Sequence, residues 1–118
     1  MSWSSESSAT QLTGVTDTEQ FFDVTPQLNP GEMARVQVEA NPPASPTDAL
    51  VVNVYGTLDG TNWDDEPILR REIPNDKDPN QVSFPIIGVY QFRVGVKSSG
   101  TTDSFTADMS YRTDGVSL

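Results

Sequence analysis

Apolar and polar residues alternate along four segments of the chain, and this period of two is typical of half-buried β-strands. Within residues 32–40, positions 34, 36, 38 and 40 hold Ala or Val, and positions 35, 37 and 39 hold Arg, Gln and Glu. The same alternation runs through residues 89–97 and 104–112. Residues 50–58 are apolar on both faces over much of their length, which predicts a more central strand.

Weaker strand patterns lie in residues 19–25, 68–73 and 81–86. Clusters of Asn, Asp, Gly, Pro and Ser separate the segments and predict turns. No segment has apolar residues at the i, i+3, i+4 spacing over a helical length. The pattern therefore predicts an all-β fold, an antiparallel β-sandwich or jelly roll of about seven to eight short strands.

The two strongest strands carry definite burial predictions. The turn at residues 98–103 is expected to close a hairpin between residues 89–97 and 104–112. Arg93 and Asp108 are expected to face outward. The residues expected to be mostly buried are Tyr90, Phe92, Val94, Phe105, Met109 and Tyr111.

The N-terminus has a different composition. Five of the first eight residues are Ser, so residues 1–11 are expected to be a flexible arm that precedes a single β-sandwich domain at residues 12–118. Trp3 stands out in this arm, and a tryptophan there is a candidate anchor on a neighbouring molecule. The first residues have neither the basic start nor the apolar run of a signal peptide, which predicts synthesis in a cytoplasm.

Charge and missing residue types exclude several functions. Seven Lys+Arg against 17 Asp+Glu give a formal net charge of −10, which argues against nucleic acid and anionic membranes as partners. The chain has no Cys and no His, so it has no thiolate nucleophile and lacks the commonest general base and transition-metal ligand. We therefore predict no enzyme activity and no catalytic residues.

The segment at residues 56–66 admits three interpretations. Asp59 and Gly60 form a tight turn and Trp63 packs back on the strand end, or Trp63 is a platform for a sugar ring, or the loop contacts another protein. The candidate interface residues are Trp3, Asp59, Asn62, Trp63, Asp64 and Asp65.

The acidic residues also raise a Ca²⁺ hypothesis, but their spacing is not that of an EF-hand and solvated acidic loops are the preferred interpretation. We predict no metal and no cofactor. The carboxylates concerned form two clusters: Asp59, Asp64, Asp65 and Glu66 in one, Asp76 and Asp78 in the other.

Four runs of the sequence can be compared with known families: residues 29–40 (NPGEMARVQVEA), 54–67 (VYGTLDGTNWDDEP), 88–96 (GVYQFRVGV) and 106–112 (TADMSYR). Together they resemble small structural proteins of tailed phages, in particular capsid decoration (cement) proteins. The resemblance extends from about residue 20 to the last run, and no motif in it is specific to a chemistry.

The resemblance implies a non-enzymatic virion protein, made in the host cytoplasm, that binds the major capsid protein and stabilises the capsid lattice from the capsid surface. It also implies a homo-oligomer, with a trimer expected. The alternatives are a carbohydrate- or receptor-binding β-sandwich module of a phage tail, and a tail or head-completion component.

Overall fold

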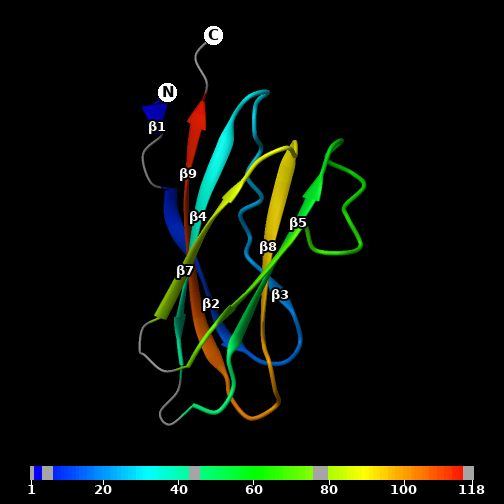
Figure 1. The fold of residues 1–118 in the computed structure, drawn as a ribbon. Helices are drawn as coiled ribbons and strands as arrows, with labels where there is room; N and C mark the ends of the chain where they lie inside the picture. Colours follow the sequence, from blue (N-terminus) through cyan, green and yellow to red (C-terminus); the bar gives the residue numbers. More distant parts are fainter. Residues whose placement is uncertain (1, 4–6, 43–45, 76–79, 116–118) are drawn as a thin grey trace.

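The computed structural model describes residues 2–3, 7–42, 46–75 and 80–115, which form nine strands in two antiparallel sheets (Figure 1). Within these residues no helix is long and apolar enough to cross a membrane. Sheet A contains β1 (Ser2–Trp3), β2 (Ser7–Val15), β4 (Met33–Asn41), β7 (Asn80–Ile86) and β9 (Phe105–Gly115). Sheet B contains β3 (Gln20–Phe21), β5 (Leu50–Thr57), β6 (Leu69–Ile73) and β8 (Gln91–Ser98). The predicted all-β sandwich is confirmed.

The core lies between the two sheets and is made by every second residue of the long strands. On β8 these residues are Phe92, Val94 and Val96, all fully buried. The inward residues of the other long strands include Ala34, Val36, Val38 and Ala40 on β4, Leu50, Val52 and Val54 on β5, and Phe105, Ala107 and Met109 on β9. The predicted registers of β4, β8 and β9 are therefore confirmed.

Two of the six predicted core residues differ from the expectation. Tyr111 is only half-buried against the core. Tyr90 is 41% exposed, so its predicted burial is wrong. It precedes the first residue of β8, and its amide nitrogen donates to the carbonyl oxygen of Thr57 at 3.0 Å, in the turn region beyond the sheet ladder. The strand begins at Gln91, whereas the alternation in the sequence begins two residues earlier, and Tyr90 therefore precedes the strand.

The predicted hairpin between the two strongest strands is also wrong. β8 pairs with β5 and β3 in sheet B, whereas β9 pairs with β4, β2 and β1 in sheet A. The connection at residues 99–104 therefore crosses from one sheet to the other. Alternation along a strand identifies its buried face. It does not identify the sheet to which the strand belongs, because both sheets of a sandwich bury one face in the same core.

Two aspartates hold this crossing in place. The Asp103 carboxylate accepts hydrogen bonds of 2.6 Å from the amides of Thr47 and Asp48, on the connection from β4 to β5. In return the Asp48 carboxylate accepts from the amides of Thr102 and Asp103, at 3.0 and 2.8 Å. Each of the two sheet-crossing connections thus accepts hydrogen bonds from the backbone amides of the other. The sequence patterns did not indicate this pairing of Asp48 with Asp103.

The N-terminal segment differs most from the sequence-based expectation. Residues 2–3 and 7–11 are not a flexible arm in the structure, because β1 and β2 pair antiparallel along one edge of β9. The register runs from Ser2 opposite Gly115 to Val15 opposite Phe105, with two irregularities in β2. Backbone pairing with β9 organises this segment despite its polar composition. The side chain of Trp3 lies outside the described residues.

Proline and charge protect the exposed sheet edges. Pro85 lies in β7, the edge strand of sheet A, and Pro67 and Pro74 flank β6, the edge strand of sheet B. β6 also carries the exposed charged residues Arg70, Arg71 and Glu72. Proline cannot donate to a neighbouring strand and charges disfavour edge-to-edge pairing, so these residues protect the two edges from pairing with another chain.

Candidate protein-binding surface

Asp59 organises the loop that the sequence singled out, between β5 and β6. Its Oδ1 atom accepts hydrogen bonds of 2.8 Å from the amides of Thr61 and Asn62, and its Oδ2 atom accepts one of 2.6 Å from the Asn62 side chain. Gly60 takes the positive φ of 80° that the turn requires. Asp59 and Asn62 are thus bonded to each other and shape the loop.

These hydrogen bonds also change the acidity of Asp59. The backbone amides of Asn62 and Thr61 stabilise the ionised carboxylate and hold the pKa of Asp59 well below its ordinary value. Because the folded-state pKa is lowered, the stabilisation is complete above the unfolded pKa near 3.8 and is lost as the pH falls through the folded-state pKa.

Replacing Asp59 by alanine is therefore expected to loosen this loop already at neutral pH, because two amides lose their acceptor. In a Trp3→Phe background, the fluorescence of Trp63 should shift to the red. The unsubstituted loop should show that shift only in strong acid. Asp65→Ala, which removes an exposed carboxylate from the same loop, is the control. An unshifted Asp59→Ala spectrum would contradict the assigned role.

Trp63 lies over the outer face of sheet B and packs against Arg93. The Arg93 Cζ atom is 4.9 Å from the centre of the Trp63 ring, 4.3 Å from that of Phe21 and 5.6 Å from that of Tyr55. Trp63 also forms an isolated β-bridge with Thr57. This geometry supports the first interpretation of the loop, in which Trp63 packs back on the strand end, and it leaves the ring half-buried.

Glu19 extends the cluster that Arg93 forms with the three aromatic rings across sheet B. Its carboxylate accepts hydrogen bonds from the Asn53 side-chain amide at 2.8 Å and from the Tyr55 hydroxyl at 3.0 Å. Burial, and then the hydrogen bond to Glu19, raise the pKa of Tyr55. A Cβ added at Gly95 would lie 2.9 Å from both Phe21 Cε1 and Glu19 Cδ, so a glycine in mid-strand lets this cluster lie flat on the sheet.

Several of the exposed hydrophobic residues lie on connections at one end of the sandwich, the end that carries this loop and the upper end in Figure 1. Leu58 is 79% exposed and follows β5, Ile87 is 67% exposed and follows β7, and Tyr90 precedes β8. Thr57 and Tyr90 are hydrogen-bonded through their backbones, which places Leu58 and Tyr90 on adjoining connections. We call Leu58, Ile87 and Tyr90 the end patch. Ile68, 45% exposed, lies at the base of the loop.

The structure thus separates the six predicted interface residues. Asp64 and Asp65 are exposed, Trp63 is half-exposed, and Asp59 and Asn62 are exposed but serve the turn. Only the backbone of Trp3 is described, paired with Asp114. Sequence reasoning missed the end patch because Leu58 and Tyr90 continue the alternation of their strands. The Pro and Gly residues that flank these strands were the available signal.

No metal site can be built from what the structure describes. The described residues hold no group of three or more Asp, Glu, His or Cys that could bind a metal ion. The second acidic cluster, Asp76 and Asp78, lies outside the described residues.

Comparisons with known proteins identify a similar fold but no family. No family model matches the chain, and no curated protein matches it. A similar fold occurs in a solved structure described by the words "Bacillus endospore appendages form a novel family of disulfide-linked pili". Its TM-score is 0.51 at 9% sequence identity, over 95% of this chain and 87% of that one. At this identity the likeness establishes the fold alone, a two-sheet β-sandwich.

Proposed function

We propose that this protein is a non-enzymatic decoration protein that binds a phage capsid lattice through its loop end and stabilises it. The observation that supports attachment at this end is the end patch. Exposed Leu, Ile and Tyr residues that share one end of a domain are candidates for a protein interface. The patch lies on short connections beside a loop that its own hydrogen bonds hold in shape, so little ordering is needed on binding.

The chemistry of this end suits a protein partner. Tyrosine is enriched among the residues that dominate interface energies, and the large aliphatic side chains of the end patch supply apolar area to bury. Exposed Asp64 and Asp65 lie on the same loop system and would form a charged rim. With a net charge of −10, the chain would be steered toward a positively charged surface of the major capsid protein.

The capsid as the specific partner is supported by the sequence resemblance to phage decoration proteins. The chain of similar fold is described as part of a pilus, a repeated protein assembly, which is compatible with the proposal but carries no more than the fold. A homo-oligomer, with a trimer expected, remains part of the proposal.

Replacing the end patch by serine in a triple variant, Leu58→Ser/Ile87→Ser/Tyr90→Ser, is expected to weaken binding to undecorated capsid particles. A loss of about 1 kcal/mol for each side chain would raise the dissociation constant about hundredfold. The measurement is co-sedimentation with undecorated particles assembled from a candidate major capsid protein. The melting temperature should stay within a few degrees, because these side chains are exposed.

The matched control is Thr101→Ala/Thr102→Ala/Ser104→Ala, which changes three exposed residues at the opposite end of the sandwich. It should bind like the unsubstituted protein. Equal binding by the end-patch variant and the control would contradict attachment through the loop end. Failure of the unsubstituted protein to sediment with the particles would contradict the capsid function itself.

A further inference from the structure

The end of the sandwich that carries the end patch also holds a cavity of about 260 Å³. It lies between residues 28–32, which lead into β4, and residues 88–90, which belong to the connection from β7 to β8. We call this cavity the end pocket. Its apolar wall is formed by Leu28, Pro30, Val89 and the end-patch residue Tyr90. The end pocket is therefore part of the surface proposed for attachment.

Hydrogen bonds and close packing fix both walls of the end pocket. The Leu28 amide donates to the Tyr90 carbonyl oxygen at 2.7 Å, which ties one wall to the other. The Glu32 amide donates to the Asn29 carbonyl oxygen at 2.9 Å and closes the turn before β4. The Tyr90 ring packs on Gly60, where an added Cβ would lie 3.2 Å from the ring. A cavity held in this way needs little reordering when a side chain enters it.

Glu32 gives the end pocket its charge. Among the described residues that line the pocket, no other carries a formal charge at neutral pH. Glu32 is half-buried, and its Oε1 atom accepts a hydrogen bond of 2.9 Å from the Asn29 amide, so the carboxylate is held beside another lining residue. No Lys or Arg in the described part of the chain pairs with it. A carboxylate with spare acceptor capacity beside apolar walls suits a cationic side chain with a long apolar stem.

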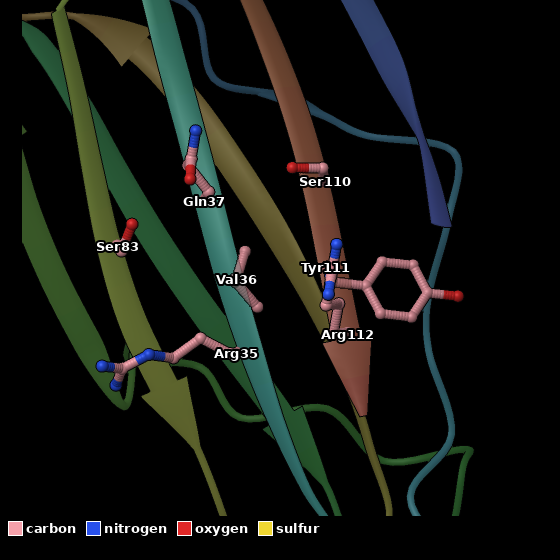
Figure 2. Close-up of a pocket in the computed structure, with 7 residues that line it drawn as sticks. All are labelled: Arg35, Val36, Gln37, Ser83, Ser110, Tyr111 and Arg112. Atoms are coloured by element: carbon pink, nitrogen blue, oxygen red, sulfur yellow. The ribbon is translucent and has the colours of Figure 1, made fainter. Parts of the chain in front are cut away.

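Another cavity, of about 310 Å³ on the outer face of sheet A, has the opposite charge (Figure 2). Its lining includes Arg35 and Arg112 and, among the described residues, no Asp or Glu. Figure 2 shows the Arg35 side chain extending over β7, away from β9. A cationic ligand would be repelled there and attracted at Glu32, so the sheet A cavity serves as a control within the same molecule.

We propose that the end pocket binds an arginine side chain of the major capsid protein. The arginine stem would pack on Leu28, Pro30 and Val89, and the guanidinium would pair with the Glu32 carboxylate. Arginine suits this pocket better than lysine, because its planar guanidinium is weakly hydrated, binds carboxylates in a bidentate way and stacks on aromatic rings such as Tyr90. Arginine is also enriched at protein interfaces. The inference rests on the proposed function, since it names the side chain that the capsid contact uses.

A small probe tests the end pocket without particles. The probe is N-acetyl-arginine methylamide, and its neutral isostere N-acetyl-citrulline methylamide is the comparison. In amide NMR spectra of the full chain, the arginine probe should shift the signals of Gly31, Gly88 and Tyr90, with a dissociation constant on the order of millimolar. The citrulline probe should bind at least about threefold more weakly. The signals of Gln37 and Ser83, which line the sheet A cavity, should not move.

Glu32→Gln removes the charge but keeps an acceptor for the Asn29 amide, so the turn should persist. It should weaken binding of the arginine probe about fivefold and weaken sedimentation with undecorated particles as well. Glu72→Gln is the matched control, because it changes the net charge equally at an exposed position on β6. It should bind the probe and the particles like the unsubstituted protein.

Three outcomes of the probe measurement would overturn the inference. They are unmoved signals at the end pocket, equal binding of the two probes, and equal weakening by Glu32→Gln and Glu72→Gln. Each of them leaves the proposed function intact if the unsubstituted chain sediments with particles through the end patch. Unchanged particle binding by Glu32→Gln would overturn the assignment of the arginine to the capsid protein. A chain that binds the arginine probe but no particles would instead contradict the proposed function.

Discussion

Replacing Phe92 by alanine is expected to lower the free energy of unfolding by about 3–5 kcal/mol. The Phe92 ring is fully buried at 0% exposure, on a strand paired on both sides, and lies among core residues from both sheets. The neighbouring strands are held by continuous ladders, so the cavity cannot easily close. The measurement is equilibrium unfolding in urea, with the midpoint lowered and the slope unchanged.

Tyr90→Ala is the matched control, since it removes a similar ring two residues away. With 41% of Tyr90 exposed, the loss should be about 1 kcal/mol or less. The difference between the two losses measures how much burial of an aromatic ring contributes to the free energy of unfolding at the start of β8. Similar losses for both would mean that Tyr90 is packed as tightly as Phe92, contrary to the structure.

Deleting residues 1–11 is expected to lower the melting temperature on the order of 10 °C, through a loss of about 3 kcal/mol. The deletion removes β1 and the first part of β2, and it leaves the edge of β9 from Asp108 to Gly115 without its partner. The unpaired backbone groups would become a new sheet edge, so increased aggregation is also expected. Differential scanning calorimetry of the isolated protein measures the first effect.

Deleting only residues 1–6 is the control, because it removes β1 but keeps β2 (Ser7–Val15). This shorter deletion should lower the melting temperature by less than half as much as deletion of residues 1–11. An unchanged melting temperature after deletion of residues 1–11 would show that this segment is a free arm, as its composition alone suggests. Weaker particle binding with unchanged stability would assign it to attachment.

The candidate surface was only partly predictable from the sequence. The Asp-Gly turn and Trp63 pointed to the right loop because their residue types have strong local preferences. Whether Trp63 faced outward or packed on Arg93 depended on three strands that are distant in sequence.

The sequence by itself determined the fold class, the positions of the long strands and the face that each strand buries. Side chains alternate strictly along a strand, so the apolar face of β4 or β9 is a local property that needs no partner to be recognised.

Only the tertiary structure decided which strands become neighbours. β8 and β9 lie in different sheets, and the Asp48 and Asp103 carboxylates hold the connection that crosses between them. The polar N-terminal segment became β2 because β9 offered it backbone partners. Both outcomes depend on backbone hydrogen bonds between distant segments, which leave no hydrophobic pattern in the segments that make them.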